Sequence, residues 1–255
     1  MKFGCHAVLF RELIKSDTPR VLEGLSSSGF RGVEIGSRFF GIDERDRLVG
    51  ELAASGMEMS GMHVGASYDE WSADWEQAAA RVVGVAQFVQ GLPNKNVILS
   101  AGKPSGEIDL PAACAHIDEA ARRCGELGVT LCYHNHWWEF ENNRLIYSTL
   151  LERAPHLMLA PDLGWLYVAG YDPEDFIREN APRIAYAHLR DVKADRKTFA
   201  ELGEGDMDLA AIVSLLDRTL PQEGWVVVEY EEGEQDFSRY QRAHLFVSRL
   251  PGSRW

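Results

Sequence analysis

Two histidines near the middle of the chain have the spacing of a ligand site. They are His134 and His136, which close an apolar run beginning at Thr130 and are followed by two tryptophans and two glutamates. Side chains at positions i and i+2 of a strand point to the same face, so the two imidazoles would lie together. Taken alone, the pair fits hydrogen-bonded surface histidines as well as a site for a metal or a polar substrate.

Three later apolar runs also end in a residue type that binds metal ions. They end in Asp162, His188 and Glu229. Imidazole nitrogens and carboxylate oxygens together suit a divalent ion such as Mn, Co, Zn or Mg. We therefore predict a metal site made of His134 and these three residues. Cysteine is a poor candidate ligand, because Cys132 lies one register before His134 and can line the interior instead.

Further polar residues lie at equivalent positions of other apolar runs. His6 follows the first run, Glu34 lies within the second, and His63 follows the third. Each alone has an ordinary structural explanation, such as a packing or backbone hydrogen bond. Chance does not readily supply all of them at the same position, so we expect these three residues to line the site and contact a substrate.

Eight strand–helix pairs would position these residues. The strands are expected at 2–7, 32–36, 58–64, 96–99, 130–134, 157–162, 184–188 and 225–230, and the helices at 18–28, 43–54, 69–90, 111–127, 144–153, 173–180, 209–220 and 238–249. The strands are apolar on both sides, as in a parallel sheet covered by helices. Eight such units favour an α/β fold of the (β/α)8 TIM-barrel type over a doubly wound sheet, with the polar strand ends on one face. No linker divides the chain, so we expect a single domain over 1–255.

Composition limits the class of partner. The chain has 255 residues, 45% of them hydrophobic, which is enough for a full core. Its net charge of −13, from 39 acidic and 26 basic residues, disfavours nucleic acid and anionic membranes as partners. Its apolar runs are too short to span a membrane, there is no signal-peptide core, and four cysteines without CxxC spacing indicate reduced, buried thiols. We expect a cytoplasmic protein; the oligomeric state stays open, a homo-oligomer included.

Aromatic residues gather after the fifth and sixth runs. Trp138 and Trp165 are candidates for substrate contact, whereas packing is the preferred explanation for Tyr167. Flat rings at a pocket rim suit an uncharged carbohydrate better than a phosphate. There is no P-loop or GxGxxG motif, so no nucleotide cofactor is implied.

Over nearly its whole length, the chain resembles the xylose-isomerase-like TIM barrels, and most of all their sugar phosphate isomerase/epimerase and inosose dehydratase branch. The resembling segments are Gly32-Val-Glu-Ile35, Tyr133-His-Asn-His136, Asp162-Leu-Gly-Trp165, His188-Leu-Arg-Asp-Val-Lys193, Leu202-Gly-Glu-Gly-Asp206 and Gly224-Trp-Val-Val-Val-Glu229. The separation of 26 residues between Asp162 and His188 (188 − 162) is similar to the spacing of the family's Asp and His ligands.

The resemblance implies a divalent metal held by the strand-five residue, Asp162, His188 and Glu229. Many family members have a glutamate at the strand-five position, where this chain has His134. In those epimerases the glutamate is also the second acid/base residue, paired with the one that matches Glu229. A neutral imidazole removes one negative charge from the ligand set and argues against a two-glutamate mechanism. As an alternative, Glu139 or Glu141 could fold back in place of His134.

These residues suit proton abstraction beside the carbonyl of a keto-sugar or keto-inositol. A divalent ion polarises the carbonyl, and Glu229 and His136 are the acid/base candidates, although His136 could instead be only a hydrogen-bond donor. Arg190 would bind substrate oxygens or pair with Asp191. The outcome could be isomerisation, epimerisation or dehydration by a lyase, and the loss of one glutamate favours dehydration. The alternatives are a non-catalytic sugar-binding barrel and an endonuclease IV-like phosphodiesterase, against which the acidic charge counts.

Overall fold

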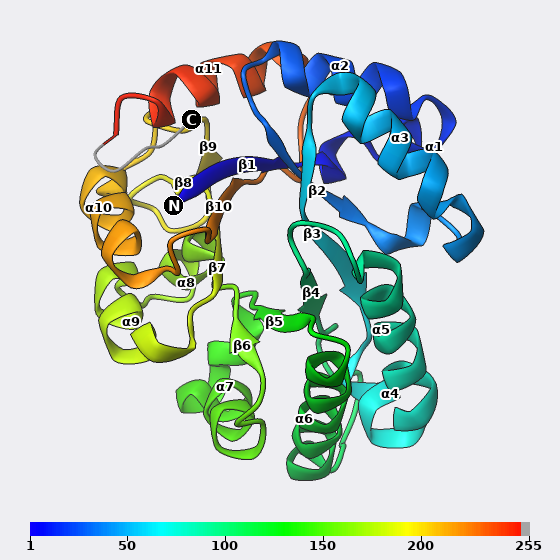
Figure 1. The fold of residues 1–255 in the computed structure, drawn as a ribbon. Helices are drawn as coiled ribbons and strands as arrows, with labels where there is room; N and C mark the ends of the chain where they lie inside the picture. Colours follow the sequence, from blue (N-terminus) through cyan, green and yellow to red (C-terminus); the bar gives the residue numbers. More distant parts are fainter. Residues whose placement is uncertain (251–255) are drawn as a thin grey trace.

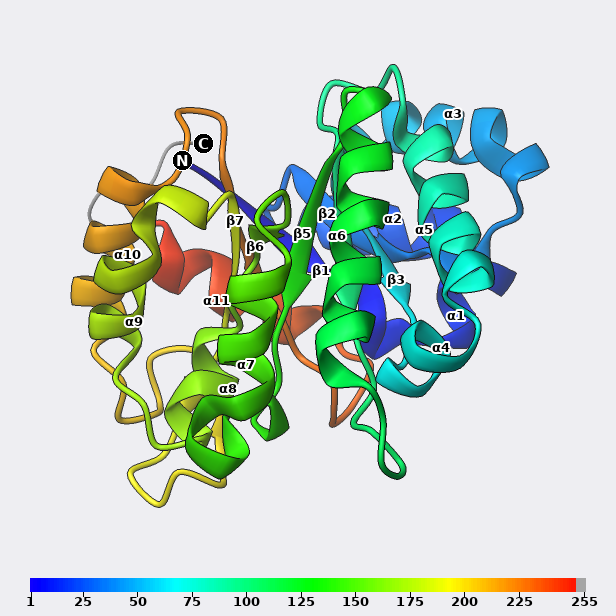
Figure 2. The ribbon, with the colours of Figure 1, turned by 90° about the horizontal axis from the view of Figure 1, so that it is seen from below.

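Eight parallel strands form the barrel that the sequence predicts. In the computed structural model, which describes residues 1–250, their order around the sheet is β6 (Met158–Leu159), β5 (Thr130–His134), β4 (Asn96–Ser100), β3 (Glu58–Gly65), β2 (Gly32–Gly36), β1 (Lys2–His6), β10 (Trp225–Val228) and β7 (Tyr186–Leu189). Two isolated parallel bridges, Leu159–Ile184 and Asp162–His188, join the chain across the gap between β6 and β7. The helices form a ring around the strands (Figure 1), and seen from below they flank the strands on either side (Figure 2).

The outer ring is made of eleven α-helices within the described residues. They are α1 (Glu12–Ser16), α2 (Thr18–Ser27), α3 (Arg45–Ser55), α4 (Tyr68–Ala73), α5 (Trp75–Val89), α6 (Leu110–Glu126), α7 (Glu141–Arg153), α8 (Leu163–Val168), α9 (Pro173–Asn180), α10 (Leu209–Thr219) and α11 (Phe237–Val247). Six of them, α2, α6, α8, α9, α10 and α11, begin after an aspartate whose side chain accepts a hydrogen bond from a backbone N–H of the first turn. Such N-caps satisfy donors that the helix itself leaves free and thereby fix where it starts.

Several details differ from the predicted elements, among them the short helices α1 and α8, which were not predicted. The helix expected over 69–90 is two helices, α4 and α5, because the backbone at Asp74 (φ −143°, ψ 60°) is not helical. The sixth strand has two residues rather than six. A short antiparallel hairpin, β8 (Asp191–Val192) and β9 (Phe199–Ala200), follows β7 and was not predicted. It lies just beyond the strand that carries His188.

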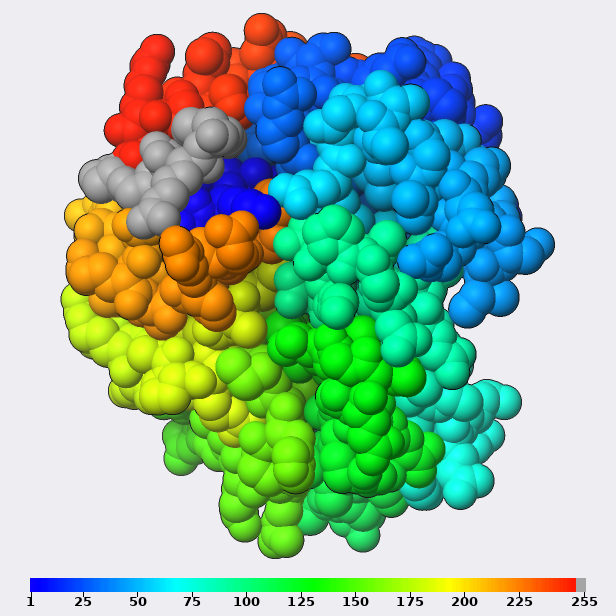
Figure 3. All heavy atoms as spheres, viewed as in Figure 1, coloured from blue at the N-terminus to red at the C-terminus, as the bar shows by residue number. Residues whose placement is uncertain are grey.

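Large side chains fill the inside of the barrel. Ile98, Cys132, Ala160, Tyr186, Trp225 and Val227 form a buried cluster of their own, separate from the main layer between strands and helices. Gly32 is required beside Trp225, because a Cβ atom at this position would overlap the indole ring. Atoms fill the centre of the ring in the space-filling view of the same face (Figure 3). All four cysteines are free and buried, in agreement with the prediction of buried thiols.

Residues 1–250 contain no helix that is both long and apolar enough to cross a membrane.

Candidate metal centre and active site

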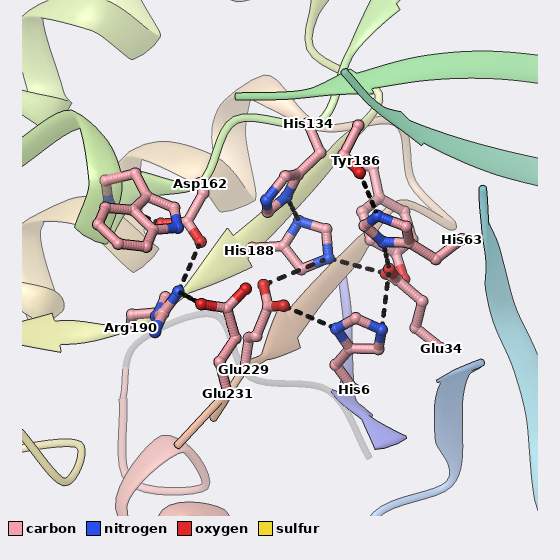
Figure 4. A network of polar contacts seen from close by, with 12 residues as sticks. His6, Glu34, His63, His134, Asp162, Tyr186, His188, Arg190, Glu229 and Glu231 are labelled. Carbon is pink, nitrogen blue, oxygen red and sulfur yellow. Dashed lines mark hydrogen bonds and ion pairs between the residues drawn. The ribbon is translucent and has the colours of Figure 1, made fainter. Parts of the chain in front are cut away.

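The polar residues predicted to share one end of the barrel do come together. Three of these residues lie at or near the end of a strand: His6 and His134 are the last residues of β1 and β5, and His63 lies near the end of β3. Glu34 is in the middle of β2, His188 is in β7, and Asp162 and Glu229 follow β6 and β10. The carboxyl ends of parallel barrel strands all meet on one face, which explains why residues so far apart in sequence become neighbours. Figure 4 shows His188 and Glu229 in the middle, with Asp162 on one side and Glu34 on the other.

The four predicted metal ligands have donor atoms within reach of one another. One donor atom from each of His134, Asp162 and Glu229 lies within 4.8 Å of the other two. His188 lies beside this group: its Nδ1 atom is 3.0 Å from Nδ1 of His134, and its Nε2 atom is 4.0 Å from Oε2 of Glu229. It forms a second possible group of ligands with His6 and Glu229. All four residues are buried.

Each of the two carboxylates uses one oxygen in a hydrogen bond and leaves the other without one, although Asp162 Oδ2 lies 3.7 Å from Nη1 of Arg190. Oδ1 of Asp162 accepts the backbone N–H of Trp165 at 2.8 Å, and Oε1 of Glu229 lies 2.8 Å from Nδ1 of His6. The other oxygens, Asp162 Oδ2 and Glu229 Oε2, are buried and have no hydrogen-bond partner anywhere in residues 1–250. Buried polar atoms are almost always satisfied in folded proteins. Two unsatisfied carboxylate oxygens facing two imidazoles therefore fit a divalent cation.

Glu34 holds the rings behind these donors. Its Oε2 atom is 2.8 Å from Nε2 of His188, and both side chains are fully buried. If Nε2 donates its proton to Glu34, Nδ1 of His188 keeps its lone pair and faces His134, an arrangement common for metal-binding histidines. The other oxygen of Glu34 lies 2.9 Å from Nδ1 of His63 and 3.6 Å from Nε2 of His6. The buried carboxylate of Glu34 is thus engaged by three imidazoles, and its contact with a substrate stays a prediction.

Mutual charges set the protonation of the cluster. Burial alone would lower the pKa of His188, but the nearby carboxylates of Glu34 and Glu229 raise it to about 9. Burial would likewise raise the pKa values of Glu34 and Glu229, but the surrounding imidazoles hold both well below the usual range. Burial raises the pKa of Asp162 and lowers that of His134. His134 is therefore neutral at neutral pH and has a lone pair to offer a cation.

His136 lines a small cavity next to the ligand cluster. The cavity has a volume of about 220 Å³ and is also lined by His6, His63, Ser100 and Glu229. The imidazole of His136 stacks on Trp138, with ring centroids 4.0 Å apart and planes 13° apart. Trp138 is not among the residues that line this cavity, and its contact with a substrate stays a prediction.

Neither Glu139 nor Glu141 takes the place of His134. Glu139 is fully buried, and its two oxygens accept the Tyr133 hydroxyl at 3.0 Å and the His136 backbone N–H at 2.9 Å. Glu141 lies at the surface and forms an ion pair with Lys103. His134 instead faces the cluster, as the contact with His188 shows.

Arg190 and Trp165 lie between the ligand cluster and a second, larger cavity of about 820 Å³. The Arg190 guanidinium is buried over the Phe199 ring, its Nη1 atom pairs with Glu231 at 3.0 Å, and it lies 3.7 Å from Oδ2 of Asp162. Glu231 lines both cavities and was missed from the sequence. Its signal was its spacing, since it stands two residues after Glu229 and an extended chain points both side chains the same way.

Asp191, the expected partner of Arg190, binds backbone instead. Its Oδ2 atom accepts the N–H groups of Gly203 and Gly205, both at 2.9 Å. Gly205 has no room for a Cβ atom, which would overlap the Asp191 carboxylate. The Leu202–Asp206 segment is thus tied to the end of the barrel by one buried side chain, and it contributes Glu204 to the wall of the larger cavity.

Comparisons with known proteins agree with this fold. The family model described as "Xylose isomerase-like TIM barrel" matches residues 22–247. An inosose dehydratase of Geobacillus kaustophilus is 26% identical, over 98% of this chain and 84% of that protein. The rhizopine catabolism protein MocC of Rhizobium meliloti is also 26% identical, over 46% of this chain and 41% of its own.

Solved structures share the barrel at low identity. A probable 3-DHS dehydratase, AsbF, from Bacillus anthracis superposes with a TM-score of 0.77 at 15% identity, covering 98% of this chain and 99% of that one. D-psicose 3-epimerase from Clostridium cellulolyticum H10 gives a TM-score of 0.75 at 15% identity, covering 97% of each chain. The relatives named here as dehydratases and epimerases are enzymes, and the family model spans most of the sequence. The chain belongs to the xylose isomerase-like TIM barrel family.

Proposed function

We propose that this protein is a divalent-metal-dependent lyase that removes water from a keto-inositol or a related keto-sugar. The observation that carries the proposal is the pair of buried, unsatisfied oxygens, Asp162 Oδ2 and Glu229 Oε2, beside His134 and His188. The likeness to inosose dehydratase over almost the whole chain supports the choice of substrate class.

His134, Asp162, His188 and Glu229 would hold the ion, with His188 using Nδ1. When bound, a divalent ion supplies a Lewis acid that polarises the substrate carbonyl and makes the neighbouring C–H bond more acidic. Two carboxylates balance the two positive charges of such an ion, so the cluster would be close to neutral once the ion is in place.

Glu229 is the base of the proposed reaction. It lines the small cavity and is ionised, because the imidazoles around it keep its pKa well below the usual range although burial would raise it. Since Oε2 is assigned to the ion, the proton would go to Oε1, the oxygen that contacts His6. The C–H bond next to the carbonyl breaks, its proton passes to Glu229, and its electron pair moves into the carbonyl group as an enolate. The pair then forms the new carbon–carbon double bond as the C–O bond on the adjacent carbon breaks, and the hydroxyl leaves as water with a proton from the imidazolium form of His136.

The small cavity suits one polyol ring. Its volume of about 220 Å³ is below the roughly 300–1,000 Å³ typical of sites for drug-sized ligands, and imidazole, hydroxyl and carboxylate groups line it.

The residues that line this cavity favour elimination over epimerisation. The strand-five position offers no carboxylate base, because His134 occupies it and both oxygens of Glu139 are engaged. The second carboxylate that lines the cavity, Glu231, is paired with Arg190.

The test is to incubate the metal-loaded protein with an inosose, a 2-keto-inositol, in D₂O. We expect loss of water from the substrate and growth of an enone absorbance. Deuterium entering the recovered substrate or its epimer, without loss of water, would contradict dehydration and indicate an isomerase or epimerase. A purified protein holding much less than about one equivalent of divalent ion, and inactive when reloaded, would favour a sugar-binding barrel.

A further inference from the structure

Glu139 is a buried carboxylate to which the proposed reaction gives no task. It is fully buried, and within residues 1–250 its one ion-pair partner is His136, whose Nδ1 atom lies 3.6 Å from Oε1. A charge so deep in a protein is costly unless it is paired and hydrogen-bonded. The Tyr133 hydroxyl donates to Oε1 at 3.0 Å and is itself 2.9 Å from the Tyr68 hydroxyl. Two elements, β5 and α4, thus hold this carboxylate in place.

Only the Nδ1 edge of the His136 ring faces the Glu139 carboxylate. Its Nδ1 atom is buried and has no hydrogen-bond partner in the described part of the chain, and the carboxylate of Glu139 is beside it. Stacking on Trp138 fixes the plane of the ring. The two ring nitrogens lie on different edges, so an Nδ1 edge that faces Glu139 directs the Nε2 edge away from this carboxylate. His136 also lines the small cavity, so a substrate bound there could contact its Nε2 edge.

We propose that Glu139 is a positioning residue that keeps a proton of His136 on Nδ1 and turns Nε2 toward the cavity. The neutral ring is then the tautomer protonated on Nδ1, and the acid form is the imidazolium, which gives up its second proton from Nε2. The tautomer of a histidine is set by the hydrogen bond that its other nitrogen makes. The distance of 3.6 Å is longer than a hydrogen bond, but such contacts are often long before the substrate binds and shorten in the complex. The proposal rests on the proposed function in one respect, the assignment of proton transfer to His136.

Glu139 contacts the main chain of His136 as well as its ring. Oε2 of Glu139 accepts the backbone N–H of His136 at 2.9 Å, so one side chain fixes both the main chain and the ring of that residue. Tyr133 precedes His134 directly on β5. The strand that carries the predicted metal ligand therefore also positions the predicted acid.

Nuclear magnetic resonance of the zinc-loaded protein with ¹⁵N-labelled histidine rings tests the pairing without any substrate. The signals of His136 are assigned by their absence in His136→Gln. We expect the wild type to carry the proton on Nδ1, Glu139→Gln to gain the tautomer protonated on Nε2, and Glu141→Gln, a surface control, to match the wild type. An Nε2-protonated ring in the wild type, or no change in Glu139→Gln, would overturn the proposal.

Kinetics with inosose as the probe give the second readout. We expect Glu139→Gln to lower kcat about 10- to 100-fold with KM within about threefold of the wild type, because the lost contact positions an acid rather than binding substrate or metal. Zinc content should stay the same, and Tyr133→Phe, which keeps the buried ring, should lower kcat less. A raised KM with unchanged kcat, or loss of zinc, would contradict a positioning role. If the wild type does not convert inosose, the proposed function fails, and the tautomer experiment still decides the role of Glu139.

Discussion

Nε2 of His188 lies 2.8 Å from Oε2 of Glu34, and neither side chain is exposed to solvent. This contact leaves Nδ1 as the nitrogen with which His188 would bind a metal. We predict that Glu34→Ala lowers zinc or cobalt affinity about 10- to 100-fold, whereas Glu34→Gln, which keeps an acceptor for the Nε2 proton, lowers it less. Competition with a chelator measures both affinities, and Glu126→Gln on the surface of α6 is the control. Equal affinities in all four proteins would remove Glu34 from the support of the metal site.

Substitutions of the ligands should separate metal binding from proton transfer. We expect Asp162→Ala and His188→Ala to lose both the metal and turnover, since rigid strand ends offer no replacement donor. His136→Ala should keep the metal and lose about 100-fold or more in turnover, as is usual when an acid or base is removed. Metal analysis and inosose turnover of the same preparations decide this. If all three variants lose the metal equally, His136 is itself a ligand.

The number of protons released on metal binding should depend on pH through the pKa of His188. That pKa is raised to about 9 by Glu34 and Glu229 against the effect of burial, so His188 is protonated in the metal-free protein at pH 8 and must lose its proton to bind a cation. We predict a release of about one proton per ion at pH 8, with an apparent affinity that rises with pH and levels off above about pH 9. Titration calorimetry in buffers of different ionisation enthalpy measures this number. Binding at pH 8 with no proton release would mean that His188 is neutral or not a ligand.

The contact of Gly32 with Trp225 predicts a large effect on stability. A Cβ atom at position 32 would overlap the indole inside the barrel, so Gly32→Ala must displace a buried ring. We expect a loss of about 1–3 kcal/mol in the free energy of unfolding, the usual range for overpacking. Gly84 in α5 is the matched control, because a Cβ atom there meets nothing within 4 Å. Gly84→Ala should be neutral or more stable by up to about 1 kcal/mol, and denaturant unfolding compares the two variants.

Much of this architecture follows from local patterns in the sequence. The eight strands could be predicted because each is buried on both sides and therefore reads as a continuous apolar run. The location of His134, Asp162, His188 and Glu229 near one another followed from the rule that parallel strands of a barrel end on one face. The break at Asp74 could not be predicted, because the apolar pattern continues through Trp71 and Trp75 on both sides of it.

The contacts that tune the site were beyond the reach of sequence patterns. Glu34 and His188 are 154 positions apart, and His6 and Glu229 are 223 apart, so their hydrogen bonds exist only once the ring of strands has formed. The ion pair of Arg190 with Glu231 could not be predicted either. Asp191 is nearer to Arg190 in sequence, but its carboxylate accepts hydrogen bonds from backbone N–H groups of a loop. Side-chain hydrogen bonds between distant strands depend on register and rotamer, which no local period encodes.

The bridge between Asp162 and His188 lies at the seam of the barrel, the place where β6 and β7 meet. The strand on one side, β6, has only two residues, and few backbone hydrogen bonds cross this seam, among them those from the N–H groups of Ala185 and His188. An ion bound by both Asp162 and His188 would link β6 to β7 where few backbone hydrogen bonds join them. Removing it with a chelator should speed hydrogen exchange at these two amides while leaving the β2–β3 pair unchanged, because local opening follows the weakest cooperative unit. Unchanged exchange at these amides would show that the barrel stays closed without the ion. Faster exchange would mean that the residues proposed to bind the ion also hold the barrel closed.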